Sequence, residues 1–219
     1  MLALLHTSPV HVPVFDALRD QEHPGLELRH LVAEDLLGRA RADGPAAVAD
    51  DVRAKVREAV GRGVRAVLCT CSTIGGAAEA AASAAGVPVL RVDRPMAAEA
   101  VAAGSRVVVL AALESTLRPT VTLVGEEAVR AGRSVEVRTV LVEDAWACFE
   151  AGDTTEYVRR VADAADAVTG ADAIVLAQAS MAPAERLTTT RVPVLSSPRP
   201  GLAAAARLCH PAPRRHPGG

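Results

Sequence analysis

A thiol stands where an apolar run gives way to an alanine-rich segment. The run covers 66–70, the thiol is Cys71, and Ser72, Thr73 and the glycine pair 75–76 follow it. This pattern indicates a strand that runs into a helix, and the carboxyl ends of such strands are where open α/β folds bind ligands. A cysteine beside a helix N-terminus gains thiolate character, so Cys71 is the leading candidate for proton transfer or nucleophilic attack. Its alternative role is that of a buried structural cysteine.

A second copy of this pattern lies about a hundred residues later. The apolar run 172–177 ends at Gln178, with Ser180 close behind, and a Val-Pro-Val-Leu segment follows each copy, at 87–90 and at 192–195. Each of these segments leads to an Arg-Pro pair. Such self-similarity predicts two related lobes with a cleft between them, into which both strand ends point. The first lobe brings thiols to that cleft and the second brings none.

Hydroxyl side chains follow several of the predicted strands. Ser72 and Thr73 follow the thiol, Thr7 and Ser8 follow the first strand, and Thr116 takes the corresponding turn of the second lobe. Together with free backbone N–H groups, such hydroxyls can bind a carboxylate. They can equally cap the helices that follow, and one residue can do both. The pattern therefore points to a small anionic substrate.

Two histidines and a second thiol accompany these residues. His6 and His11 flank the first turn, and each is either a general base or a structural residue. Cys69 precedes Cys71 by two positions and is expected to pack in the core. Because this Cys-x-Cys pair lacks a second ligand pair, we expect no metal site.

The elements that must position these residues alternate between strand and helix along the chain. This alternation predicts a mostly parallel sheet with right-handed crossovers, and the fold class is α/β. The predicted strands are 2–5, 26–31, 65–69, 87–92, 106–110, 135–142, 172–177 and 192–195, and the predicted helices are 12–19, 48–60, 75–85, 95–103, 117–131, 144–152 and 155–168.

The repeat divides the chain into two pseudo-symmetric lobes, each a mostly parallel sheet flanked by helices, with the active site in the cleft between them. The first lobe covers 1–92 with the Cys71 motif and is completed by 190–210. The second lobe covers 93–189 and carries Gln178 and Ser180. A tail, 211–219, is rich in Pro, Gly, Arg and His and is expected to be disordered.

Composition excludes several classes of partner. The net charge is −2, and no stretch combines basic with aromatic residues, so we expect no nucleic-acid partner. No apolar run reaches membrane-spanning length, no secretory leader is seen, and the cysteines are unpaired, so a cytoplasmic protein without a membrane partner is expected. The single lysine, Lys55, lies in a predicted solvated helix. It is a poor Schiff-base residue for pyridoxal phosphate, and no cofactor is expected.

The chain resembles the aspartate/glutamate racemase superfamily, which includes hydantoin racemases, maleate isomerases and arylmalonate decarboxylases. The likeness spans most of the chain. It rests on Cys71-Ser72-Thr73, which resembles the family's Cys-Asn-Thr, on Thr116, and on 175–181, which resembles the second cysteine motif. It implies two pseudo-symmetric lobes, no cofactor, and a substrate held between two cysteines that remove and return an α-proton.

This chain departs from the two-cysteine pattern. The second cysteine's place is taken by Gln178, or by Ala179 if the register shifts by one residue. Neither side chain exchanges a proton at neutral pH. A single thiol fits one-sided protonation or nucleophilic addition better than racemisation. Gln178 would then orient the substrate through its amide.

Three functions follow from these observations. The first is a racemase- or isomerase-type enzyme that acts beside the carboxylate of a small acid or amino acid, with Cys71 as proton-transfer group or nucleophile. The second is a decarboxylase, a lyase in which Cys71 protonates one face, and the third is a catalytically silent carboxylate-binding protein. Arg94, Arg118 and Arg199 are candidates for a second carboxylate. By resemblance the protein is expected to be a homodimer.

Overall fold

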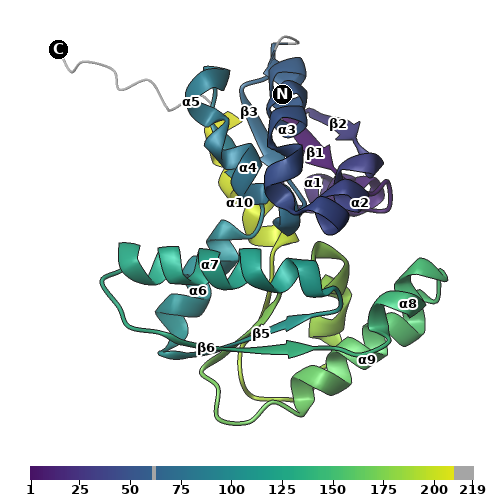
Figure 1. Ribbon diagram of the computed structural model, residues 1–219, viewed down its shortest axis with the longest axis vertical. Helices are drawn as coiled ribbons and strands as arrows, with labels where there is room; N and C mark the ends of the chain where they lie inside the picture. Colours follow the sequence, from purple (N-terminus) through teal and green to yellow (C-terminus); the bar gives the residue numbers. More distant parts are fainter. Residues whose placement is uncertain (61–62, 210–219) are drawn as a thin grey trace.

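The computed structural model describes residues 1–60 and 63–209 and contains two four-stranded parallel sheets (Figure 1). The strand orders are β2-β1-β3-β4 and β6-β5-β7-β8, so the second sheet repeats the order of the first. The predicted α/β class and the two related lobes are confirmed. The predicted tail, 211–219, lies outside the described residues.

The first sheet places the Cys71 motif next to its central strand. Its two central strands are fully buried apolar runs, as expected for parallel strands covered on both faces. Every strand pair is parallel, so the carboxyl ends of all four strands meet at one edge. The strands are β1 (Leu2–His6), β2 (Leu28–Val32), β3 (Ala66–Cys69) and β4 (Val89–Arg91).

The helices around this sheet cover both of its faces. They are α1 (His11–Glu22), α2 (Glu34–Asp43), the 3₁₀ helix η1 (Pro45–Val48), α3 (Ala49–Val60), α4 (Ser72–Ala80) and α5 (Ala82–Ala85). One face packs against α2, α3 and α4, and Phe15 of α1 packs on the other. The predicted helix 75–85 is thus two helices, and the first begins directly after Cys71.

The second sheet is built in the same way. Its strands are β5 (Arg106–Ala111), β6 (Glu136–Leu141), β7 (Ala173–Leu176) and β8 (Val194–Ser196). One face packs against α6 (Arg94–Ala103) and α7 (Glu114–Arg130), and the other against α8 (Ala145–Glu150), α9 (Thr154–Asp166) and the 3₁₀ helix η2 (Ala179–Arg186). The first turns of α4, α7 and η2 therefore lie at the carboxyl ends of their sheets.

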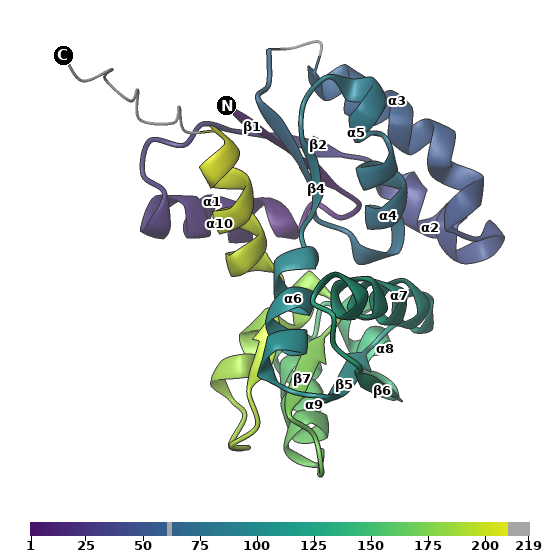
Figure 2. The same cartoon turned by 90° about the vertical axis from the view of Figure 1, so that its left-hand side faces the viewer.

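The two lobes exchange one helix each. Helix α6 follows β4 of the first sheet but packs on the second, whereas α10 (Pro198–Cys209) follows β8 of the second sheet and packs on the first (Figure 2). A Cβ at Gly201 would lie 2.4 Å from the Val92 carbonyl oxygen, so glycine permits this close approach. The exact lobe boundaries remain a proposal. We assign 190–197 to the second lobe and not to the first, because β8 pairs with β7 of the second sheet.

Candidate active site

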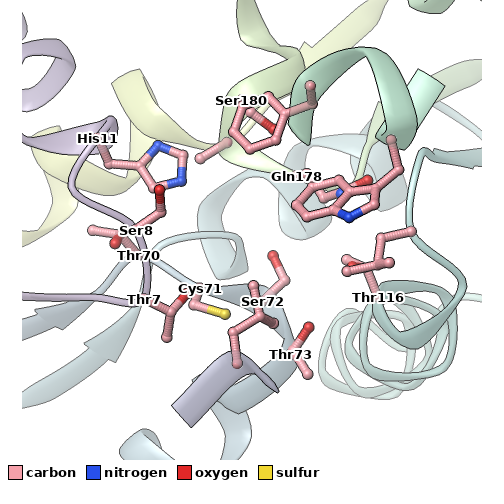
Figure 3. A pocket seen from close by; sticks show the side chains of 15 residues that line it. Thr7, Ser8, His11, Thr70, Cys71, Ser72, Thr73, Thr116, Gln178 and Ser180 are labelled. Atoms are coloured by element: carbon pink, nitrogen blue, oxygen red, sulfur yellow. The ribbon is translucent and has the colours of Figure 1, made fainter. Parts of the chain in front are cut away.

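The predicted thiol, hydroxyl and amide residues of the site line one pocket between the two lobes (Figure 3). Its space, the open mouth included, is about 440 Å³, which suits a small acid. The predicted residues that line it are Cys71, Thr7, Ser8, Ser72, Thr73, Thr116, Gln178 and Ser180. The pocket thus combines one thiol, one amide and several hydroxyls drawn from both sheets.

Cys71 occupies the N-cap position of α4. Its backbone is extended, with φ −111° and ψ 117°, and its half-buried side chain points its sulfur into the pocket (Figure 3). Unpaired backbone N–H groups and the helix dipole at such a position stabilise a thiolate. Cys69, by contrast, is fully buried in the core, and burial raises the pKa of its thiol. Of these two cysteines only Cys71 is available for chemistry.

Gln178 is the counterpart of Cys71 in the second lobe. It lies two residues after the end of β7, as Cys71 does after β3, and it is the N-cap of η2 with a similar backbone, φ −118° and ψ 139°. Its Oε1 accepts a hydrogen bond of 2.7 Å from the backbone N–H of Ala112. The amide NH2 group is therefore left to donate into the pocket. In this geometry Gln178, and not Ala179, corresponds in position to Cys71.

The hydroxyl groups of the pocket divide into free and occupied ones. Ser72 donates to the carbonyl oxygen of Ala177 at 2.9 Å and so joins the two lobes. Ser180 exchanges a 2.8 Å hydrogen bond with the buried Tyr157 hydroxyl. The Thr70 hydroxyl is also occupied, by His6 and by the Leu5 carbonyl oxygen. No hydrogen bond to another described residue occupies the hydroxyls of Thr7, Ser8, Thr73 and Thr116. These four are free to bind a substrate.

The helix N-termini at the pocket have no side-chain caps. The N-cap residues of α4 and α7 are Cys71 and Leu113, and neither side chain bonds its helix. Ser72 and Thr116 therefore do not cap these helices, because they lie inside the first turns. Backbone N–H groups in the first turns of two helices can instead bind an anion such as a carboxylate.

An apolar wall, which sequence reasoning missed, faces these polar groups. Trp146 and Phe149 of α8 stack with ring centroids 4.9 Å apart, and both line the pocket with Leu37 and Leu113. The signal that could have placed them is their position just after β6, at the carboxyl edge of the second sheet.

Arg41 of α2 links the first lobe to this apolar wall. Its guanidinium lies 5.8 Å from the Trp146 ring centroid and 3.4 Å from Glu150 Oε1, which also accepts the Trp146 indole N–H at 2.6 Å. These contacts hold Trp146 over the pocket. They are largely exposed, so each is worth about 1 kcal/mol or less.

We expect Arg41→Ala to raise KM about threefold and to leave kcat nearly unchanged, because it loosens the wall without touching the thiol. Steady-state kinetics on the acid with the highest turnover would measure this. The matched control is Arg39→Ala on the same helix, since Arg39 pairs with Asp35 and Asp51 and does not line the pocket. Equal changes in both variants would contradict a role for the Arg41 contacts.

The two histidines of the first turn have different surroundings. His11 lines the pocket, and burial lowers its pKa to about 4, so its imidazole is neutral at neutral pH. His6 is fully buried and hydrogen-bonds Thr70 Oγ1 at 2.7 Å and His30 Nδ1 at 2.8 Å. Burial, with repulsion from His30 and His11, lowers the His6 pKa to about 3. His6 is therefore linked to the pocket by its hydrogen bond to Thr70 and by its ring contact with His11.

The lowered His6 pKa makes stability depend on pH. Between pH 7 and 5 the unfolded chain binds a proton at His6 and the folded chain does not, so the free energy of unfolding should fall by about 2 kcal/mol from this residue as pH falls. His11 acts in the same sense. Urea unfolding at several pH values would measure the slope, and His6→Asn should remove about half of it. A flat profile would contradict this account.

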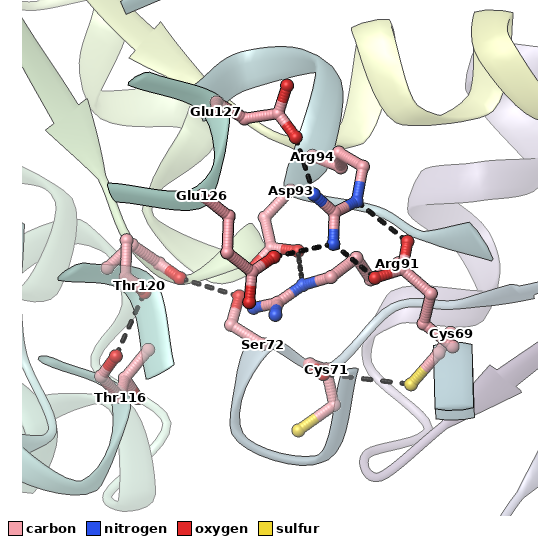
Figure 4. Close-up of polar contacts among 12 residues, drawn as sticks. Cys69, Cys71, Ser72, Arg91, Asp93, Arg94, Thr116, Thr120, Glu126 and Glu127 are labelled. Carbon is pink, nitrogen blue, oxygen red and sulfur yellow. Dashed lines mark hydrogen bonds and ion pairs between the residues drawn. The ribbon is translucent and has the colours of Figure 1, made fainter. Parts of the chain in front are cut away.

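The arginines considered for a second carboxylate lie elsewhere. Arg94 pairs with Glu79, Glu126 and Glu127 and bridges α4 to α7 (Figure 4). Arg199 pairs with Glu22, and Arg118 lines a separate cavity.

No Asp, Glu, Lys or Arg is among the described residues that line the pocket. The single lysine, Lys55, pairs with Glu58 on α3, away from the pocket. Within 1–60 and 63–209 there is no cluster of three metal-binding side chains. No helix in the same part of the chain is long and apolar enough to cross a bilayer.

The chain is similar in sequence to one known protein family. The sequence profile of the family described as Asp/Glu/Hydantoin racemase matches residues 12–209. No curated protein matches the sequence.

Solved structures with the same fold include a glutamate racemase from Bacillus anthracis (TM-score 0.70, 15% identity, 95% of this chain and 80% of that one). Allantoin racemase from Klebsiella pneumoniae is similar at TM-score 0.65 and 20% identity, over 95% of this chain and 86% of that one. Arylmalonate decarboxylase is similar at TM-score 0.60 and 19% identity, over 100% of this chain and 96% of that one. At these identities the structures show a shared fold, whereas the profile match spans nearly the whole sequence. The chain belongs to the Asp/Glu/Hydantoin racemase family.

Proposed function

We propose that this protein is a cofactor-independent enzyme of the isomerase type that acts at the carbon next to the carboxylate of a small acid. Cys71 is its proton-transfer group or nucleophile. The observation that carries the proposal is the half-buried Cys71 thiol at the N-terminus of α4, which points into a pocket lined by free hydroxyls. Homodimer formation and a cytoplasmic location remain predictions.

The chemistry begins with the substrate carboxylate at the first turns of α4 and α7, beside the hydroxyls of Thr73 and Thr116. When the Cys71 thiolate takes the α-proton, the electron pair of the broken C–H bond spreads onto the carboxylate as an enediolate. Donors aimed at the two oxygens gain strength as this charge develops, by several kcal/mol. Return of a proton from the thiol to the same face regenerates the substrate with its α-hydrogen exchanged, whereas inversion requires that a proton reach the opposite face from another donor, such as water. In the nucleophilic route, the thiolate adds to a double bond conjugated with the carboxylate and leaves after rotation.

The pocket favours an acid with one carboxylate and an apolar substituent. The N–H groups and hydroxyls can hold the carboxylate, and the Trp146 and Phe149 rings offer a surface to the substituent. Since no carboxylate side chain among the described residues lines the pocket, an ammonium group would find no ionic partner. This argues against aspartate and glutamate as the preferred substrates, although family members bear those names.

A second candidate is decarboxylation, and the observation that favours it is Gln178 at the place of a second thiol. Loss of carbon dioxide from a malonate-type acid leaves its bonding electron pair on the α-carbon as an enediolate. Cys71 then gives that carbon its proton at one face, and no second proton-transfer group is needed. The fold shared with arylmalonate decarboxylase agrees with this reading.

Proton NMR in D2O tests these proposals. The panel contains aspartate, glutamate, maleate, phenylmalonate and 2-phenylpropionate, each with wild type and Cys71→Ser. Deuterium at the α-carbon, or a geometrical isomer, formed by wild type alone supports the isomerase-type function, whereas loss of carbon dioxide supports the lyase. Saturable binding without any turnover, unchanged in Cys71→Ser, would contradict catalysis and identify a carboxylate-binding protein.

A further inference from the structure

A chain of four hydrogen-bonded side chains runs from the pocket to the protein surface. Thr70, which lines the pocket and directly precedes Cys71, lies 2.7 Å from His6 Nδ1. His6 Nε2 lies 2.8 Å from His30 Nδ1, and His30 Nε2 lies 3.3 Å from Asp16 Oδ1. Thr70 and His6 are buried, the His30 side chain is 16% exposed, and the Asp16 side chain is 40% exposed. The chain therefore connects the pocket with solvent through the interior of the first lobe.

Three neighbouring strands and one helix supply this chain. His6 ends β1, His30 lies in β2, Thr70 follows β3, and Asp16 lies in α1. Because β1 pairs with both β2 and β3, the register of the sheet fixes the spacing of the three inner side chains. The chain thus depends on the sheet and not on a mobile loop.

The contacts accept two sets of hydrogens, which differ at Asp16, because the contact between His30 Nε2 and Asp16 carries a hydrogen only in the first set. In the outward set the Thr70 hydroxyl donates to His6 Nδ1, and His6 Nε2–H donates to His30 Nδ1. His30 Nε2–H then donates to the Asp16 carboxylate. In the inward set His30 Nδ1–H donates to His6 Nε2, and His6 Nδ1–H donates to Thr70. The Thr70 hydroxyl then donates to the Leu5 carbonyl oxygen, which lies 3.2 Å away. Both rings are neutral in both sets.

We propose that this chain is a proton path between the Cys71 site and solvent, which rests on the proposed function that Cys71 carries the transferred proton. A proton leaving the Cys71 thiol reaches Thr70 Oγ1 through a water molecule in the pocket that both residues line, and each member of the chain passes its own proton outward until Asp16 releases one to water. This step converts the outward set into the inward set and leaves a thiolate. The reverse shift takes a proton from water at Asp16, returns one to the thiolate and restores the outward set. No proton is gained or lost over the two steps.

The surroundings favour a concerted shift along this path. A full positive charge on His6 is disfavoured because burial lowers its pKa to about 3. When each ring gains a proton at one nitrogen as it loses one at the other, it never carries that charge. A bound acid covers the pocket side of Cys71, so the path offers exchange with solvent while the substrate is in place. His6, His30 and Asp16 are then positioning residues that act through Thr70.

The first test needs no substrate. In ¹⁵N NMR of the full chain, the ring nitrogens of His6 should show exchange between two neutral tautomers in wild type. A single tautomer is expected in His30→Gln, which keeps a hydrogen-bonding group but cannot relay a proton. One fixed His6 tautomer in wild type would overturn the path.

The second test measures hydron exchange at the α-carbon of 2-phenylpropionate in D2O. His30→Gln and Asp16→Asn should slow it about tenfold. The matched control is Asp20→Asn, because Asp20 also pairs with Arg19 but lies outside the chain, and it should exchange at the wild-type rate. Equal rates in all variants would overturn the path even if His6 shows two tautomers. If wild type does not exchange this acid, the proposed function fails for it, and the tautomer measurement still decides the path.

Discussion

Replacing Cys71 with serine should lower turnover of the preferred acid about 10³-fold, since a positioned proton-transfer group contributes 10²- to 10⁴-fold to the rate. Among the described residues that line the pocket there is no second thiol. A serine hydroxyl is much less acidic than a thiol, so it cannot replace Cys71 as base or nucleophile. Substrate binding should change little, because the helix N-termini and the hydroxyls that hold the carboxylate remain. We therefore expect a large loss in kcat and a small change in KM.

The matched control is Cys148→Ser. Cys148 lies on α8, the helix that carries the apolar wall, yet its half-buried side chain packs against the core of the second lobe and does not line the pocket. Its replacement should leave kcat unchanged. The formation of one product is followed by NMR. If Cys71→Ser keeps full activity in this assay, Cys71 takes no part in the mechanism. Thermal unfolding of both variants would show whether a lost activity reflects misfolding.

The predicted class, lobes and pocket rest on features that a sequence displays directly. Buried parallel strands are continuous apolar runs, and β1, β3, β5 and β7 all have this form. The residues that follow such runs must meet at the carboxyl edge of the sheet, which is why the Cys71 and Gln178 motifs lie in one pocket. The internal repeat predicted the second lobe, and the structure shows that both sheets have the same strand order.

Features that depend on packing between lobes were not predictable in this way. Helix α2 has few apolar residues and a glycine, so its own pattern is weak, and it forms because Leu36 and Ala40 pack on the first sheet. Trp146 and Phe149 are apolar side chains of the kind that fills protein cores. They line the pocket only because α8 approaches α2. The chain from Thr70 to Asp16 depends on strand register, which links residues far apart in sequence.

Replacing Gln178 with cysteine should produce a racemase. Gln178 and Cys71 are the N-cap residues of η2 and α4, with similar backbone angles, so a cysteine at position 178 would present a second thiol from the opposite lobe. One thiolate could then remove the α-proton while the other thiol delivers a proton to the opposite face. We expect racemisation of single-enantiomer 2-phenylpropionate at least about 10²-fold faster than in wild type.

Gln178→Cys also removes one hydrogen bond, which lowers stability, and a control variant that loses the same bond is available. Without Gln178 Oε1, the Ala112 N–H loses its partner, which should lower stability by about 1–3 kcal/mol. Gln178→Ser suffers the same loss but supplies no thiol, so it should be destabilised similarly and should not racemise the acid. Chiral chromatography of the recovered acid separates the two variants. Racemisation by both would show that the proton at the second face comes from water, and that the amide of Gln178 serves in wild type to keep water from that face.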